Sequence, residues 1–96
     1  MKFVIFYHGP ATPPDASHKG WMTWFKNLGN ALVDQGSPLS DGTVLRADGS
    51  TAASKTSYNG YSIIEAKNKD KAVELIQDHP YLALGEEYSI EIFRRG

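Results

Sequence analysis

The strongest constraint on the fold is the segment Lys2–Tyr7, which carries large apolar side chains at successive positions. Alternate residues of a β-strand point to opposite faces of its sheet, and this splits the apolar side chains into one set of Phe3, Ile5 and Tyr7 and another of Val4 and Phe6. An antiparallel sheet that is open to water on one side is polar on that side. We therefore expect both faces of the sheet to be covered.

The residues after this strand predict a loop and then a long helix. His8-Gly9-Pro10 ends the strand, and Asp15 or Ser17 is placed to cap a helix over 18–35. Its apolar residues recur at helical spacing, at Trp21, Trp24, Phe25, Leu28 and Leu32. Gly36 then supplies a left-handed residue at the helix end, and Gly29 inside the helix predicts a close contact with the sheet.

The second half of the chain predicts three more strands and one helix. Strands are expected over 43–46, 61–66 and 88–94, with a turn at Asp48-Gly49 and a loop or weak edge strand over 50–57. Asn68 is placed to cap a helix over 69–78, and Pro80 ends it. The resulting order, β-α-β-β-α-β, predicts an α+β fold of the ferredoxin-like split β-α-β type. Both helices then lie on one face of an antiparallel sheet, in a single domain over residues 1–96.

The open face of that sheet predicts a homodimer. A chain of 96 residues without cysteine buries only about two-thirds of its unfolded surface and has no disulfide to compensate. Leaving three or four large apolar side chains in water forfeits roughly 1.5–3 kcal/mol each. A second copy, packed face to face, would cover them. The alternative is that the loop over 50–57, or long side chains of the same chain, fold over the sheet.

Composition excludes several classes of function. The formal net charge is −1 and Lys67, Lys69 and Lys71 are interleaved with acidic residues, so we expect no nucleic-acid partner. A basic amphipathic helix and an apolar run of about 18 residues are both missing, so we expect no membrane partner and a cytoplasmic location. The nucleotide-binding glycine motifs and the Gly-x-Ser-x-Gly nucleophile turn are absent. We expect no cofactor, and no metal site, because the three histidines have no converging spacing.

The chain resembles the YCII-related family of small bacterial proteins almost from end to end. The resemblance rests on an ordered set of segments at matching spacing: 3–9, 21–25, 28–29, 32–36 with 38–39, 60–66, 71–72, 79–80 and 89–92. It implies a dimeric α+β barrel, while many members of the family have no known activity. One branch carries a His–Asp pair suspected of catalysis, to which His18 does not align securely. Another carries Asp-Gly-Pro-Phe, where this chain has Asp48-Gly49-Ser50-Thr51.

Several residues are candidates for a site, each with a structural alternative. His79 beside Pro80 is a candidate acid or base, or a helix-end histidine that bonds free carbonyls. Asp34 near the predicted helix end opposes the helix dipole, so it has a partner there or is simply solvated. The candidate ligand contacts are His8, Trp21, Trp24, Lys55 and Tyr61, with Tyr58 beside them; packing and solvation are their alternatives.

Three hypotheses for function follow from these residues. The preferred one is a homodimer that holds a small apolar or aromatic molecule in a cleft beside the sheet, walled by Trp21 or Trp24. The second is a cofactor-free enzyme in which His79 and Asp34 move a proton. The third is a structural or accessory subunit without a ligand.

Overall fold

One antiparallel sheet and two helices form the body of the molecule. The computed structural model describes residues 1–10, 18–55 and 58–96. Its elements are β1 (Lys2–His8), α1 (His18–Leu28), the 3-10 helix η1 (Gly29–Ala31), β2 (Leu32–Pro38), β3 (Thr43–Leu45), β4 (Thr51–Ala53), β5 (Tyr58–Glu65), α2 (Lys69–Ile76), the 3-10 helix η2 (Pro80–Leu84) and β6 (Ser89–Arg94). The main sheet has the order β2-β5-β1-β6, and β3 pairs with β4 alone. The elements of this body run β-α-β-β-α-β, which confirms the ferredoxin-like prediction.

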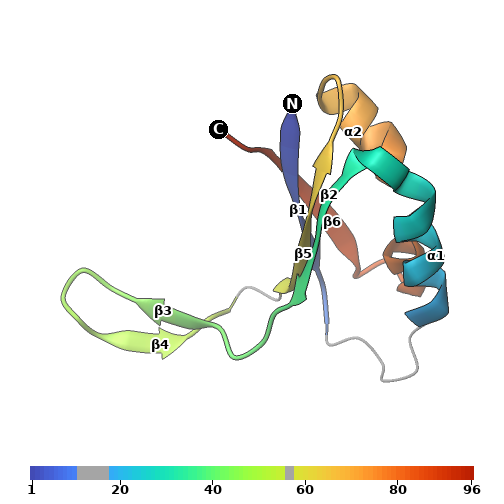
Figure 1. Cartoon of the computed structure of the whole chain (residues 1–96). Coiled ribbons are helices and arrows are strands. Elements are labelled where there is room, and N and C mark those ends of the chain that lie inside the picture. The colour runs from blue at the N-terminus through green and yellow to red at the C-terminus, as the bar shows by residue number, and fades with distance from the viewer. Residues whose placement is uncertain (11–17, 56–57) are drawn as a thin grey trace.

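The helices cover one face of the main sheet (Figure 1). The apolar core lies between these two layers and is built from Phe3, Ile5, Tyr7, Trp24, Phe25, Ile64, Ala72, Ile76 and Tyr81. The inward set of β1 is almost fully buried, because Phe3, Ile5 and Tyr7 are each at most 2% exposed. The strand alternation read from the sequence therefore separates the two faces of β1 correctly, and the structure shows that Phe3, Ile5 and Tyr7 form the face toward the helices.

Both described helices leave the other face of the main sheet uncovered, and we call it the open face. Residues paired across antiparallel strands share a face, and Phe6 pairs with Tyr61 while Val4 pairs with both Ile63 and Phe93. The open face is thus defined by Val4, Phe6, Tyr61, Ile63 and Phe93. Phe93 is 50% exposed, and its ring lies 5.8 Å from that of Phe6, centroid to centroid. This face is apolar at its centre in the single chain.

The predicted helix over 18–35 is wrong beyond Leu28, because α1 ends there and β2 begins at Leu32. Gly29 adopts φ +56°, a left-handed conformation that ends helices and favours glycine. A Cβ at Gly29 would meet nothing within 4 Å, so the expected close contact with the sheet is also wrong. Leu32 had extended the helical pattern because, as a strand residue, it still packs against the same core.

Gly36 is left-handed as predicted, with φ +81°, but it lies within β2 instead of ending a helix. The register of β2 against β5 shifts between Asp34 and Ser37, which marks a local irregularity of the strand. A Cβ at Gly36 would overlap the backbone carbonyl of Tyr61. The position therefore requires glycine for both its backbone conformation and its close approach to β5.

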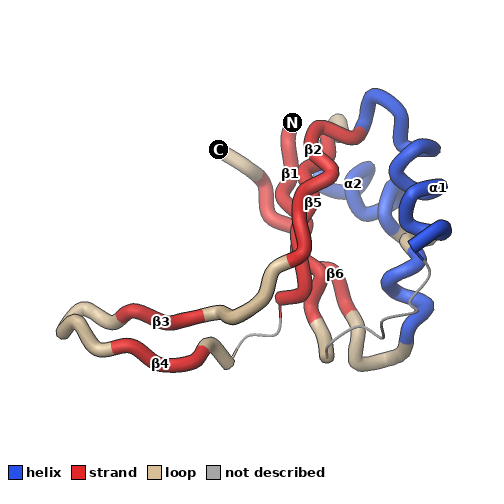
Figure 2. The backbone as a smooth tube through the Cα atoms, turned by 60° about the horizontal axis from the view of Figure 1, so that its bottom comes forward, coloured by secondary structure: helices blue, strands red, loops and turns tan. Residues whose placement is uncertain are grey.

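The segment 43–53 forms a separate hairpin, where we had expected a strand of the main sheet. Asp48 shapes its turn by accepting hydrogen bonds from the Ser50 backbone N–H at 2.9 Å and from its hydroxyl at 2.6 Å. The pairing of β3 with β4 confirms the predicted turn and the weak strand after it. Both views show the hairpin extending away from the sheet, on the side opposite the helices (Figures 1 and 2). Its described residues do not fold over the open face.

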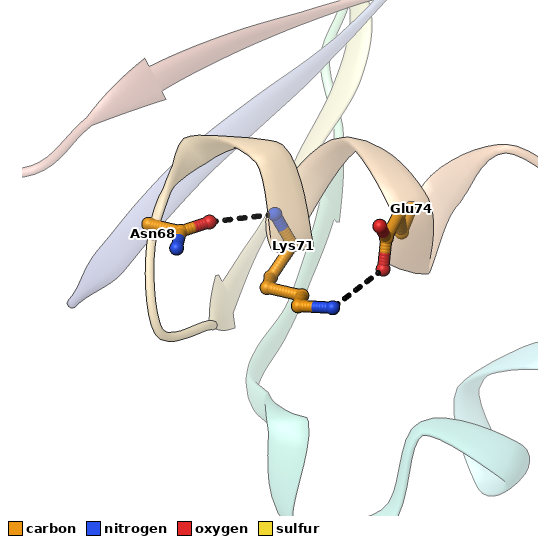
Figure 3. A network of polar contacts seen from close by, with 3 residues as sticks. All are labelled: Asn68, Lys71 and Glu74. Carbon is orange, nitrogen blue, oxygen red and sulfur yellow. Dashed lines mark hydrogen bonds and ion pairs between the residues drawn. The ribbon is translucent and has the colours of Figure 1, made fainter.

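The second helix begins where the sequence predicts. The Asn68 side chain accepts a hydrogen bond from the Lys71 backbone N–H at 2.9 Å, and Lys71 Nζ pairs with Glu74 at 3.3 Å (Figure 3). The helix ends at Ile76, two residues before the predicted end, and the turn η2 that follows was not predicted. The predicted caps Asp15 and Ser17 lie outside the described residues.

Candidate functional site

His79 lies between α2 and η2, where it caps the second of these elements. Pro80 follows it, which disfavours helical backbone at His79, and the residue is extended with φ −60° and ψ 131°. The imidazole Nδ1 accepts the backbone N–H of Tyr81 at 2.9 Å. His79 is 1% exposed. The histidine thus satisfies the N-terminus of η2, whereas the structural alternative considered above placed it against helix carbonyls.

Five aromatic side chains surround this imidazole, the outermost being Phe25 at 6.4 Å and Tyr81 at 6.5 Å. Trp24 and Trp21 of α1 lie 4.1 Å and 4.7 Å from it, between ring centroids, and Tyr7 of β1 lies at 5.0 Å. Tyr81 of η2 contacts both Tyr7 and Trp21, at 5.2 Å and 5.7 Å. We call these residues, Tyr7, Trp21, Trp24, His79 and Tyr81, the His79 cluster. Trp21 is its half-buried member, whereas the other four are at least 93% buried.

A chain of hydrogen bonds crosses the sheet from His79. Ser62 Oγ donates to the backbone carbonyl of Gln35 at 2.6 Å, so it accepts from the Tyr7 hydroxyl at 2.7 Å. The Tyr7 hydroxyl in turn accepts from His79 Nε2 at 3.3 Å. A backbone N–H can only donate, so His79 Nδ1 is an acceptor and the neutral ring carries its proton on Nε2. Every bond from His79 to Gln35 therefore has one defined direction.

Burial keeps both titratable members of this hydrogen-bonded series uncharged. Desolvation lowers the pKa of His79 to about 4, an effect that the nearby Asp78 carboxylate opposes. Desolvation also raises the pKa of Tyr7 to about 12, although its hydrogen bond with Ser62 lowers it. The imidazole and the phenol are neutral at pH 7 as a result. Among the described residues, each buried side-chain nitrogen and oxygen has a hydrogen-bond partner.

The hydrogen bonds of His79 favour a role in orienting its neighbours over a role in abstracting a proton. A general base needs a free lone pair within reach of its substrate, and both nitrogens of His79 are engaged inside the cluster. A fully satisfied buried network fixes side chains in one geometry. Trp21 differs, because its ring packs edge-on to Tyr7 at 4.8 Å and is still half-buried at the rim.

The two residues predicted to act as a catalytic pair have separate surroundings. Asp34 lies exposed on the edge strand β2, where its Oδ1 accepts the backbone N–H of Gly36 at 2.8 Å. His79 is buried and bonds to Tyr7 and Tyr81. The partner that the sequence predicted for Asp34 is thus a turn of its own strand.

The predicted ligand residues are divided between the two sides of the sheet. Trp21 and Trp24 are in the His79 cluster, whereas Tyr61 belongs to the open face. His8 is paired with Tyr58 and its ring lies 5.5 Å from that ring, so it borders the open face. Tyr58 is in β5 instead of a loop. Lys55 lies exposed after β4.

Three residues that bond or pack around His79 were not among the sequence candidates, namely Tyr7, Ser62 and Tyr81. Tyr7 and Ser62 are polar-tipped residues on the inward set of their strands, and such residues need a buried partner. Tyr81 follows His79-Pro80, a pattern with a capping residue before a proline in the first turn. Those two signals could have found them.

Other features of the described chain bear on the classes of function considered above. Within residues 1–10, 18–55 and 58–96, no three His, Asp or Glu side chains gather as a metal-binding group. None of the helices in that part of the chain combines the length and hydropathy needed to span a bilayer.

Comparisons with known proteins give one family and one fold. The family model of the YCII-related domain matches residues 1–94, and a search of the curated proteins finds no significant match. Among solved structures, the chain is similar to 5-chloro-2-hydroxyhydroquinone dehydrochlorinase from Burkholderia phenoliruptrix, solved in complex with 2,5-dihydroxybenzoquinone. The two share 18% sequence identity with a TM-score of 0.56, over 100% of this chain and 96% of that chain. The likeness supports the fold of the dimeric α+β barrel type.

Proposed function

This chain belongs to the YCII-related family, and from that premise we propose that it works as a homodimer that binds a small, flat aromatic molecule beside Trp21. The observation that carries the proposal is the half-buried indole of Trp21, which stands at the rim of a sealed aromatic cluster. Aromatic rings favour offset or edge-on contact with other rings. A planar ligand at this rim would continue the packing that Tyr7 and Tyr81 already make with Trp21.

The open face supports the homodimer in this proposal. Phe6 and Phe93 pack together there, and no helix or strand of the described part of their own chain forms a layer over them. A second copy seated on this face would remove both rings from water, at roughly 25 cal/mol per Å² of apolar surface. The segment over 50–57, which was the alternative cover, does not lie there in its described part.

The neighbouring enzyme suggests a chemical class for the ligand. That enzyme was solved with 2,5-dihydroxybenzoquinone, a flat six-membered ring with polar groups at its edge. We propose a ligand of this class for the present chain. The hydrogen-bonded pair of Tyr7 and His79 would hold the uncharged side chains behind the site in one geometry. The Trp21 indole would form the apolar wall of the site.

Calorimetric titration with 2,5-dihydroxybenzoquinone tests the proposal. We expect saturable binding to the wild-type protein and at least tenfold weaker binding to Trp21→Ala. Met22→Ala is the matched control, because Met22 is the next residue of α1 and is 44% exposed; its affinity should equal that of the wild type. Equal binding to all three proteins, or none to the wild type, would refute the site at Trp21.

An enzymatic role is the second candidate, and the dehydrochlorinase neighbour favours it. Under this alternative, His79 with Asp34 would move a proton, which requires His79 to leave the bonds that now engage both of its nitrogens. Incubation with 5-chloro-2-hydroxyhydroquinone and measurement of released chloride would separate the two. Chloride release that is lost in His79→Gln supports the enzyme, whereas binding without release supports the binding protein.

A further inference from the structure

The β3–β4 hairpin takes no part in the proposed binding site at Trp21. Its strands pair with each other and not with the main sheet, and both views show it extending to the side of the open face (Figures 1 and 2). The Cα radius of gyration is 14.5 Å, against roughly 12.5 Å for a compact domain of this length. The hairpin therefore projects from the body as an arm.

The arm carries apolar side chains in water. Leu45 beside its turn is 72% exposed, and Val44 next to it is 41% exposed. An isolated two-stranded hairpin is at best marginally stable in water and needs a packing partner. The turn is nonetheless well formed, since the Arg46 N–H donates to the Ser50 carbonyl at 2.8 Å. A structured arm with an exposed leucine near its tip suits contact with another molecule.

The area of the open face favours a second copy of this chain as the molecule that the arm contacts. Four strands about 4.8 Å apart and roughly 23 Å long give a flat footprint near 440 Å² per copy, or about 900 Å² for a pair. Stable interfaces bury about 1,200–2,000 Å² in total. As a flat footprint, which understates accessible surface, the open face reaches only the low end of this range, so contact at its margin would strengthen a pair of copies, and the arm stands beside that margin.

The arm is also long enough to make this contact. It leaves the body at Leu39, whose backbone N–H bonds to the Asn59 carbonyl at 3.0 Å. The stretch from Leu39 to Leu45 spans about 20 Å when extended, whereas two stacked sheets lie about 10 Å apart. This reach of at most about 20 Å exceeds the sheet spacing, so Leu45 can contact the flank of a second copy stacked face to face.

We infer that the β3–β4 hairpin of each copy clasps the flank of the second copy of this chain and buries Leu45 there. The inference rests on the homodimer proposed above and adds to it an interaction surface outside the main sheet. The hairpin is fixed by its own turn, and the partner copy supplies the packing that its apolar side chains lack in the single chain.

Sedimentation equilibrium of Leu45 variants tests the clasp. We expect Leu45→Asp and Leu45→Lys to weaken dimerisation at least tenfold, because both remove apolar burial and they carry opposite charges. Val73→Lys is the matched control: Val73 is 39% exposed on α2, on the helix side, and its change should leave the dimer intact. Phe93→Asp on the open face should abolish the dimer.

A label at the same position provides a second readout. The chain has no cysteine, so Leu45→Cys accepts a single environment-sensitive dye, whose emission should shift to the blue as concentration rises through dimerisation. A wild-type chain that stays single would overturn both the dimer and the clasp. A wild-type dimer matched by both charged Leu45 variants, or an unshifted dye, would overturn the clasp alone and leave the dimer standing.

Discussion

Two of the three residues in the chain from His79 to Ser62 are titratable, and both are kept neutral. His79 caps η2 through Nδ1 and donates through Nε2 to Tyr7, so both ring nitrogens have fixed roles. The Tyr7 hydroxyl donates in turn to Ser62 Oγ. The hydrogen bonds of this series therefore require neutral His79 and neutral Tyr7. Removing or charging either residue leaves its neighbour without a hydrogen-bond partner.

Stability should depend on pH through His79. Burial lowers its pKa in the folded chain to about 4 from 6.5, so between these values the unfolded chain binds a proton that the folded chain does not. The free energy of unfolding should therefore fall as pH drops from 6.5 toward 4, by at most about 3 kcal/mol.

Urea unfolding at pH 7.5 and pH 4.5 measures this loss. His79→Gln keeps an acceptor for the Tyr81 N–H but does not titrate, so it should lose about 2 kcal/mol less than the wild type over that interval. Equal losses in both proteins would show that His79 is not the group responsible.

Tyr7→Phe should destabilise the fold by about 1–3 kcal/mol, because it leaves the buried Nε2–H of His79 without an acceptor. The control is Ser50→Ala, which removes an exposed hydroxyl bonded to Asp48 at 2.6 Å, outside the main sheet, and should have much less effect. Thermal unfolding of both variants decides the matter. A Tyr7→Phe protein as stable as the control would mean that the hydrogen-bonded chain contributes little.

At the scale of the elements, the sequence predicts what depends on local periodicity and caps. The alternation of β1, the Asn68 cap and the turn at Asp48-Gly49 are each set by neighbours in the chain, and each is confirmed. The helix over 18–35 failed at Gly29, because a pattern of apolar residues does not distinguish a helix from a strand that packs on the same core. The cluster around His79 joins residues more than fifty positions apart in the sequence, so periodicity alone could not assemble it.

Gly29 and Gly36 allow one substitution to be compared at two positions. Both have positive φ, which costs a residue with a Cβ about 1–2 kcal/mol. A Cβ at Gly29 meets open space, whereas at Gly36 it overlaps the Tyr61 carbonyl. We therefore expect Gly29→Ala to cost about 1 kcal/mol and Gly36→Ala several times more, because β2 must separate from β5. Chemical denaturation of the two variants measures this; equal costs would contradict the close approach of β2 and β5.

The start of α2 permits a similar comparison. Asn68→Ala removes the cap of the Lys71 N–H and should cost about 1 kcal/mol, or a fall of roughly 4–8 °C in Tm for a domain of this size. Glu74→Ala removes an exposed ion pair and should change stability by less than about 0.5 kcal/mol. A larger effect at Glu74 than at Asn68 would contradict this assignment of the cap.

For the whole molecule, the two sides of the sheet have different roles. The helix side holds the sealed His79 cluster with Trp21 at its rim, where we propose that a flat ligand binds. The open face and the β3–β4 hairpin lie on the other side, where no described element of the single chain covers Phe6, Phe93 and Leu45. The proposed function needs a second copy there, because hydrophobic burial is the largest favourable term in association.

Sedimentation equilibrium of the wild-type protein at micromolar concentration tests this claim most directly. We predict one species at twice the 10.6 kDa mass of a single chain, dissociating only on dilution. A folded species that remains at the mass of one chain across that range would mean that the apolar open face tolerates water, and the account of a homodimer would be wrong.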